Sequence, residues 1–213
     1  MKAMESASYR VDWNLRTETG RASAWRFWRE AVRGPRRIGA LAPTTRTLAC
    51  ELVRQCGVES ADAIVELGAG TGIITEQILR WKRPDASVLA VERDAGFAWE
   101  LARRFPEVEV AECCASRLAE RMEIFGLEPA GSIVSTLPWG IFDPELQWRI
   151  LRQARSALAP GGTFGTIACF GWHWLEAGRC FRNLLREAFG DVTVTRVFWN
   201  NVPPAFLYLA RRE

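Results

Sequence analysis

Residues 63–72, with the sequence AIVELGAGTG, constrain the fold of this chain more than any other stretch. Ala63–Leu67 is a short apolar run, which is typical of a strand buried on both faces of a sheet. Glycines follow at every second position, and helical periodicity resumes over Ile73–Trp81. A strand, a glycine turn and a helix in this order predict the start of a nucleotide-binding βαβ unit. In such a unit the backbone N–H groups and the positive end of the helix approach the ligand.

The spacing of the glycines indicates which class of nucleotide ligand the loop would bind. A dinucleotide fingerprint, G-x-G-x-x-G, needs a glycine where this chain has Ile73. The pattern E-x-G-x-G-x-G instead resembles motif I of class I S-adenosylmethionine-dependent methyltransferases, with an ordinary tight turn as the competing interpretation. A second apolar run, 87–91, ends in Glu92, about twenty residues past the loop. A carboxylate there accepts hydrogen bonds from a ribose diol, so we expect Glu92 to hold the ribose; a solvated strand-end charge is the alternative.

The rest of the chain alternates between predicted strands and helices. Further strands are expected at 108–111, 133–137 and 163–168, and the last two, 192–198 and 206–210, form a hairpin. Helices are expected from Thr44 or Thr45 to Cys56, from Asp94 to Phe105, over 144–158 and over 181–189, with a turn at 160–162. The pattern predicts an α/β, Rossmann-like domain: a mostly parallel seven-stranded sheet with an antiparallel C-terminal hairpin and helices on both faces.

Composition excludes several classes of protein. Of 213 residues, 48% are hydrophobic, so disorder is not expected, and no run reaches the roughly 20 apolar residues of a membrane-spanning helix. The N-terminus lacks the apolar block of a signal peptide, which indicates a cytoplasmic protein. Six cysteines without a C-x-x-C pair, and a single histidine, predict neither a disulfide framework nor a metal site.

Charge separates an N-terminal arm, residues 1–37, from the domain at 38–213. Residues 1–46 hold ten Lys/Arg against four Asp/Glu, whereas 47–213 hold 18 against 21. The arm carries aromatic and basic residues at helical spacing, a pattern that predicts binding to an anionic membrane surface, here the inner face of the cytoplasmic membrane. Packing on the domain, or binding to RNA, are the alternatives. The predicted membrane contacts are Arg21, Trp25, Arg26, Trp28, Arg29, Arg33, Arg36 and Arg37.

Six short blocks occur in order along the chain: 38–46, 66–72, Glu92-Arg93-Asp94, Cys114-Ala115, Leu137-Pro138-Trp139 and 201–205. Together they resemble bacterial phospholipid N-methyltransferases of the soluble type that is related to rRNA adenine dimethylases, over about residues 20–212. The resemblance implies S-adenosylmethionine as the cofactor and S-adenosylhomocysteine as its product. It implies methylation of the headgroup of phosphatidylethanolamine towards phosphatidylcholine; another aminolipid is the alternative substrate.

The resemblance also implies a cofactor site. Its glycines line the methionine end, Glu66 lies near the amino group, and Leu41 and Pro43 cover the cofactor. Cys114 departs from the family pattern, because relatives carry Asp there for the adenine amino group; adenine recognition then falls to the backbone or to Ser116. The implied cofactor residues are Leu41, Pro43, Glu66, Gly68, Ala69, Gly70, Thr71, Gly72, Glu92, Arg93, Cys114, Ala115 and Thr136.

Three residues are candidates for the catalytic side of the site. Thr136-Leu137-Pro138-Trp139 stands where adenine N-methyltransferases carry Asn-Leu-Pro-Tyr, in which a backbone carbonyl helps to hold the target nitrogen, and we place Leu137 there. Trp139 offers a ring face to a methylated ammonium, with core packing as the alternative. His173 is a candidate proton acceptor, with a structural or surface role as the alternative.

Two other functions compete with lipid methylation. The first is an RNA adenine N-methyltransferase, which Thr136, Trp139 and the lack of residues after 213 for a helical RNA-binding domain disfavour, so no nucleic-acid partner is expected. The second is a membrane- or cofactor-binding protein in which Cys114 marks lost catalysis. The oligomeric state stays open.

Overall fold

A seven-stranded sheet organises the part of the chain that the computed structural model describes, residues 44–213. Its order is β3-β2-β1-β4-β5-β7-β6. The strands are β1 Ala63–Leu67, β2 Ser87–Glu92, β3 Glu109–Glu112, β4 Ala130–Ser135, β5 Leu158–Cys169, β6 Val192–Val194 and β7 Ala205–Arg211. The first five are parallel, and β7 runs antiparallel to both β5 and β6. The predicted sheet and its C-terminal hairpin are confirmed.

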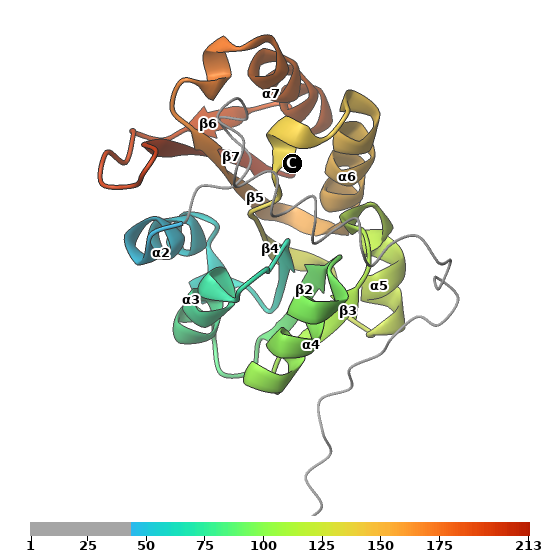
Figure 1. Cartoon of the computed structure of the whole chain (residues 1–213). Helices are drawn as coiled ribbons and strands as arrows, with labels where there is room; N and C mark the ends of the chain where they lie inside the picture. Colours follow the sequence, from blue (N-terminus) through green and yellow to red (C-terminus); the bar gives the residue numbers. More distant parts are fainter. Residues whose placement is uncertain (1–43) are drawn as a thin grey trace, which may run out of the picture.

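Helices cover both faces of the sheet (Figure 1). The helices α2 Arg46–Gln55, α3 Ile73–Trp81 and α4 Ala95–Arg104 pack into one hydrophobic core, whereas α5 Leu118–Ile124, α6 Pro144–Ala157 and α7 Glu176–Phe189 pack into the other. Among residues 44–213, none of these helices has the length and apolar character needed to cross a membrane.

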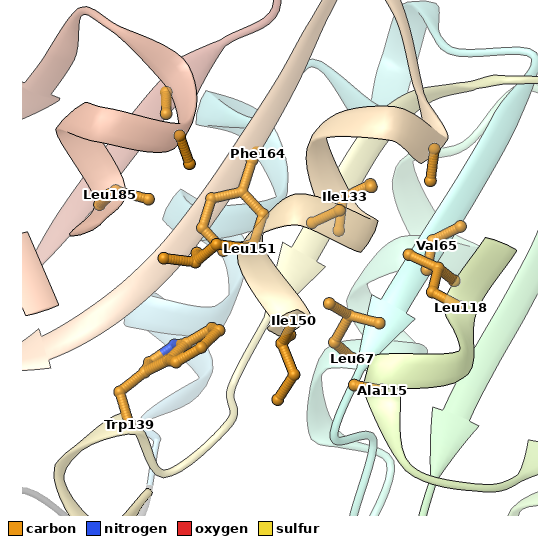
Figure 2. Close-up of a cluster of buried hydrophobic side chains, with 14 of the residues drawn as sticks. Val65, Leu67, Ala115, Leu118, Ile133, Trp139, Ile150, Leu151, Phe164 and Leu185 are labelled. Carbon is orange, nitrogen blue, oxygen red and sulfur yellow. The ribbon is translucent and has the colours of Figure 1, made fainter. Parts of the chain in front are cut away.

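The two cores follow from the alternation of side chains along each strand. In β1, Ile64 faces the core of α2–α4 and Val65 faces the core of α5–α7. In β4, Val134 faces the core of α2–α4 and Ile133 faces the core of α5–α7. All four side chains are fully buried. Each such burial stabilises the fold by about 1.5–3 kcal/mol. Figure 2 shows the second core, with α6 and α7 side chains over the strands.

Side-chain caps begin three of the helices where the sequence predicts a start. Thr45, rather than Thr44, caps α2 by accepting from the N–H of Leu48. Asp94 accepts from two N–H groups at the start of α4. Asp143 accepts from the N–H of Leu146 and precedes a proline in the first turn of α6. A cap of this kind is typically worth about 1 kcal/mol.

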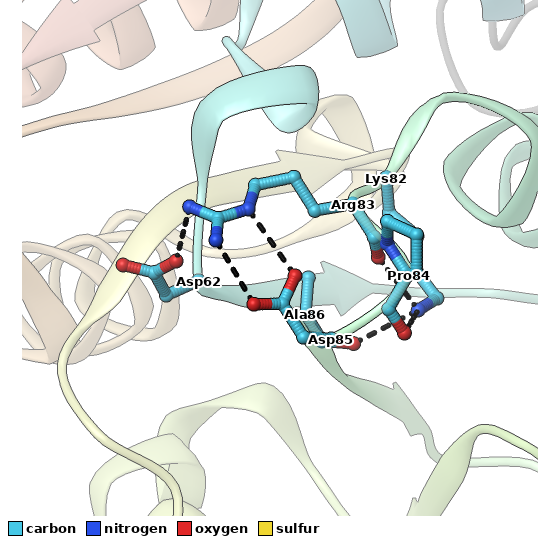
Figure 3. Close-up of polar contacts among 6 residues, drawn as sticks. All are labelled: Asp62, Lys82, Arg83, Pro84, Asp85 and Ala86. Atoms are coloured by element: carbon cyan, nitrogen blue, oxygen red, sulfur yellow. Dashed lines mark hydrogen bonds and ion pairs between the residues drawn. The ribbon is translucent and has the colours of Figure 1, made fainter.

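A polar turn connects α3 to β2 (Figure 3). The Arg83 guanidinium lies 2.8 Å from Asp62 and 2.9 Å from Asp85. The Lys82 ammonium donates to the carbonyls of Arg83, Pro84 and Ala86. Because these groups are largely exposed, water screens both ion pairs. Together, the ion pairs of Arg83 and the hydrogen bonds of Lys82 hold the turn between α3 and the start of β2.

The predicted turn at 160–162 is wrong, because these residues lie within β5. The N–H of Gly161 donates to the carbonyl of Arg212, and the N–H of Arg212 donates back to Gly162. The C-terminal residues therefore tie this segment to the end of β7. Gly161 has φ +78°, and the pairing with β4 passes from Leu158 to Thr163, so residues 159–162 bulge from the sheet.

Other helices and strands begin or end at residues that differ from the predicted ones. The strand predicted at 192–198 ends at Val194, because the hydroxyl of Thr195 accepts from the N–H of Leu207 in place of a backbone partner. The helix predicted over 181–189 begins at Glu176, and α5 was not predicted. The strands predicted at 108–111 and 133–137 are observed at 109–112 and 130–135.

Candidate functional site

The candidate site lies where the parallel strands end. Leu67 pairs with Val91 of β2 and with Ser135 of β4, and Glu92 pairs with Glu112 of β3. These four strands therefore finish at one edge of the sheet. The segments that follow them carry the glycine loop, the end of β2, Cys114 and Thr136. In open α/β sheets this edge is where ligands bind.

The glycines of the loop are needed for different reasons. Gly70 has φ +52°, and a Cβ added there would meet no heavy atom of residues 44–213 closer than 4.0 Å, so these residues leave space above it for a ligand. Gly72 has φ +82°, and a Cβ there would lie 2.6 Å from a ring carbon of Phe105. Gly70 thus leaves room for a ligand, and Gly72 lets α4 pack against the loop. Ala69 is buried beside them and Thr71 is exposed.

Glu66 is a buried acid directly before the loop. Its Oε2 accepts from the hydroxyl of Thr75 at 2.7 Å, and its Oε1 has no hydrogen-bond partner within residues 44–213. The pKa of Glu66 is raised from 4.5 to about 8, mainly by burial. The hydrogen bond from Thr75 lowers this pKa, and the charge of Glu92 raises it. An orphaned buried oxygen of this kind fits the cationic amino group of S-adenosylmethionine.

Glu92 holds the loop from the end of β2. Its Oε2 accepts from the N–H of Gly70 at 2.9 Å and its Oε1 from the N–H of Asp94 at 2.8 Å. Burial raises the pKa of Glu92, against the lowering effect of these backbone bonds. A carboxylate has about four lone-pair sites, so its oxygens can accept from a ribose hydroxyl in addition to these backbone groups. Arg93, which follows, is exposed.

Cys114 follows β3 at the same edge and is half-buried. The hydroxyl of Ser116 donates to its sulfur at 3.2 Å, so that hydroxyl is directed at the thiol. Ala115 is buried. A Ser116 that served an adenine ring would have to share its hydroxyl with Cys114.

The segment after β4 is tied to the glycine loop. The hydroxyl of Thr136 donates to the carbonyl of Gly68 at 2.7 Å. A Cβ added to Gly68 would lie 3.0 Å from Leu137 Cδ2, so the two segments are in contact. The carbonyl of Leu137 accepts from the N–H of Trp139 at 2.9 Å, and its second lone pair is left for a ligand.

Trp139 lies in the hydrophobic core (Figure 2). It is 2% exposed, its indole N–H donates to the hydroxyl of Thr166 at 2.9 Å, and its ring centroid lies 4.8 Å from that of Phe181. This placement favours the core-packing alternative. The contact of its ring with a methylated ammonium stays a prediction.

His173 lies in the loop between β5 and α7. Its ring contacts those of Phe170, Trp174 and Phe206, and its Nδ1 is buried without a hydrogen-bond partner in the described part of the chain. The role of His173 as a proton acceptor stays a prediction.

Comparisons with known proteins decide which family this site belongs to. No protein-family model matches the chain. An ornithine lipid N-methyltransferase of Singulisphaera acidiphila is 37% identical over 178 residues, which are 82% of this chain and 88% of that protein.

This chain belongs to the lipid N-methyltransferase family. A ribosomal RNA small subunit methyltransferase A of Chlamydia caviae is 28% identical over 130 residues, which are 53% of this chain and 45% of that protein.

Solved structures place the lipid N-methyltransferase in a known fold. TrmN from Thermus thermophilus has a TM-score of 0.61 at 21% identity and covers 88% of this chain, which spans 52% of TrmN. The N-methyltransferase NodS from Bradyrhizobium japonicum in complex with S-adenosyl-L-homocysteine has a TM-score of 0.60 at 15% identity and covers 80% of this chain and 88% of that one. The fold is that of class I methyltransferases, and the chain is an N-methyltransferase.

Several site predictions for this lipid N-methyltransferase fall outside the described residues. Leu41, Pro43 and the whole basic arm, from Arg21 to Arg37, precede residue 44. Of the other predicted residues, Glu92 and Thr136 are hydrogen-bonded to the glycine loop, Leu137 contacts it, and Glu66 comes directly before it.

Sequence reasoning missed two residues that support this group. Thr75 donates to Glu66 from the first turn of α3. Its position just after the glycine loop is the sequence feature that could have identified it. Gln147 donates to the carbonyls of Trp139 and Phe142 and so holds the turn after β4. No pattern in the sequence distinguishes Gln147 from the other polar residues of α6.

Proposed function

We propose that this enzyme transfers methyl groups from S-adenosylmethionine to the amino group of a membrane aminolipid. The observation that carries the proposal is the 37% identity to an ornithine lipid N-methyltransferase over 82% of the chain. Ornithine lipid is therefore the first substrate to test. Phosphatidylethanolamine, which the sequence blocks favour, is the second.

The described residues suit the cofactor. When bound, S-adenosylmethionine supplies a methyl group that is already activated on a sulfonium. Glu66 would hold its amino group through the orphaned Oε1, and the free lone pairs of Glu92 would hold the ribose. Two buried carboxylates whose pKa values are raised by burial favour a ligand that brings positive charge.

The acceptor amine would enter beside Thr136 and Leu137. The amine must be neutral to attack, and burial in a dry site beside a positive charge lowers its pKa. The Leu137 carbonyl can accept one hydrogen bond from the nitrogen. His173 Nδ1 is our candidate for the released proton, since it is buried and makes no other bond in the described residues.

The basic arm supplies the membrane contact in this proposal, at the inner face of the cytoplasmic membrane. Arginines near an anionic leaflet each contribute about 1 kcal/mol. Replacing Arg26, Arg29 and Arg33 by Ala is expected to weaken binding to anionic vesicles at physiological salt and to leave cofactor affinity unchanged. Full vesicle binding by that variant would show that the arm does not dock the enzyme.

The decisive test is a methylation assay in vesicles. The full chain is incubated with S-adenosylmethionine and with anionic vesicles that contain either ornithine lipid or phosphatidylethanolamine, and lipids are analysed by mass spectrometry. Glu66→Ala is the matched control, because it removes the predicted partner of the cofactor amino group. Methylated headgroups with the wild type, and about tenfold less or none with the control, are expected. No methylated aminolipid in either membrane would refute the proposal.

A further inference from the structure

Apolar side chains that are exposed gather on two loops at one end of the sheet. Seven large apolar side chains are exposed in residues 44–213, and four of them, Trp174, Leu175, Trp199 and Val202, lie in the segments after β5 and before β7. Their exposed fractions run from 51% to 77%. We call these four residues the apolar rim. Large apolar side chains that are exposed together mark interaction surfaces, whereas scattered ones do not.

The two halves of the apolar rim are joined through one ring. The ring centroid of Phe170 lies 5.1 Å from that of Trp174 and 5.1 Å from that of Trp199. The N–H of Phe170 donates to the carbonyl of Pro204 at 2.7 Å, which fastens the segment after β5 to the segment before β7. Trp174 and Trp199, one from each loop, therefore share one support.

The apolar rim lies at the same edge of the sheet as the candidate site. β5 is parallel to β4 and next to it, so the loop after β5 emerges beside the Thr136–Trp139 segment. A Cβ added to Gly140 would lie 3.3 Å from the indole nitrogen of Trp172, so the two segments touch. A molecule that covers the rim would also lie beside the predicted entry of the acceptor amine.

Positive charge accompanies the apolar rim. From 170 to 204 the chain carries four arginines against three acids, Glu176, Glu187 and Asp191, a balance of +1. Three of the arginines follow one side of α7 at spacings of three and four residues. None of the four forms an ion pair with another residue of the described chain. They are Arg179, Arg182, Arg186 and Arg196.

We infer that the apolar rim is a second membrane-contact surface, separate from the basic arm, that seats the open edge of the site in the headgroup layer of an anionic phospholipid bilayer. Tryptophan is the side chain that prefers this layer, and arginines that form no ion pair in the described chain suit the phosphates around it. The inference rests on the proposed function, because a lipid substrate must reach the site from a bilayer. It goes further by naming the face that meets the bilayer.

The test compares exposed tryptophans inside and outside the apolar rim. The full chain is sedimented with vesicles of phosphatidylglycerol and phosphatidylcholine, which carry no substrate amine. The double variant Trp174→Ser/Trp199→Ser is compared with Trp99→Ser, whose ring is 57% exposed on α4, and with wild type. Salt at 0.5 M shortens the Debye length to about 4 Å and so suppresses attraction by the arm.

We expect the double variant to bind vesicles about tenfold more weakly or worse at 0.5 M salt, because two large aromatic surfaces no longer leave water. Trp99→Ser is expected to bind like wild type. Val202→Glu, a second and independent variant, is expected to weaken binding as well, since a carboxylate would enter an anionic layer. Cofactor affinity and thermal unfolding verify that each variant is folded.

Unchanged vesicle binding by both rim variants would overturn the inference. So would a wild-type dimer that the rim variants dissociate while vesicle binding is retained, because the rim would then contact a second copy of the chain. The proposed function is tested separately by methylation of a short-chain aminolipid in solution with the wild type. If that reaction fails, the proposed function is wrong, and the vesicle comparison still decides whether the rim binds membranes.

Discussion

Replacing Glu66 by Gln isolates the buried acid on which the cofactor site depends. The Glu66 side chain is fully buried, with one oxygen bonded to Thr75 and the other without a partner in residues 44–213. With a pKa of about 8, it is protonated at neutral pH in the protein without ligand. A Gln amide has the same shape and offers the same acceptor to Thr75, so the variant should fold normally.

The raised pKa of Glu66 predicts how stability changes with pH. Between pH 4.5 and about 8 the folded protein keeps a proton that the unfolded chain releases, so the free energy of unfolding falls as pH rises. Each pKa unit is worth about 1.4 kcal/mol. From pH 4.5 to pH 7 this loss is about 3 kcal/mol in the wild type, and it is absent with Gln.

Urea unfolding measures this difference. The two proteins should be similar in stability at pH 4.5, and Glu66→Gln should be more stable by about 3 kcal/mol at pH 7. A stability difference that does not change between these pH values would refute the raised pKa. Because only the difference between the two proteins is compared, titration of groups that do not interact with Glu66 cancels.

Ligand binding should reverse the protonation of Glu66. A cationic amino group beside Oε1 favours the carboxylate, so binding of S-adenosylhomocysteine at pH 7 should release about 0.9 proton in the wild type. Calorimetry in two buffers of different ionisation enthalpy measures that release. Glu66→Gln should release none and bind about tenfold more weakly or worse. Equal proton release by both proteins would show that Glu66 does not meet the amino group.

Three further substitutions test other parts of the site. Gly72→Ala places a Cβ 2.6 Å from Phe105 at φ +82°, and urea unfolding should show a loss of about 2–3 kcal/mol, whereas unchanged stability would contradict the close packing. Trp139→Phe removes the bond to Thr166 and part of the core volume, so unfolding should cost about 1–3 kcal/mol less; a change in substrate KM without a change in stability would instead favour the ammonium contact. Glu92→Gln leaves one of two backbone N–H groups without its acceptor, and calorimetry should show cofactor affinity reduced about tenfold or more; wild-type affinity would exclude Glu92 from the site.

The parts of the fold that follow from local chemistry could be predicted from the sequence. The strand, glycine loop and helix at 63–81 occur as expected, because the glycines adopt backbone conformations that few other residues tolerate. Asp94 begins α4, and Glu92 lies at the carboxyl end of β2. In each case the residue and its partner are close in sequence or belong to one repeating pattern.

The features that sequence reasoning missed depend on distant partners. The segment 160–162 belongs to β5 because Arg212, about fifty residues away, bonds it. Trp139 is directed into the core by Thr166 and Phe181, whereas a tryptophan after a strand end carries no local sign of which way it points. The ring contacts that join Trp174 and Trp199 through Phe170 likewise appear only when β5 and β7 are paired.

The most direct test of the central claim is a mixed reaction that offers the enzyme every rival acceptor at once. The full chain is given S-adenosylmethionine with an isotopically labelled methyl group, together with vesicles of ornithine lipid and phosphatidylethanolamine and with ribosomal RNA. We predict that the label appears on the amino nitrogen of a lipid and that Glu66→Ala abolishes this labelling. Label on adenine of the RNA, or on no acceptor, would contradict the account.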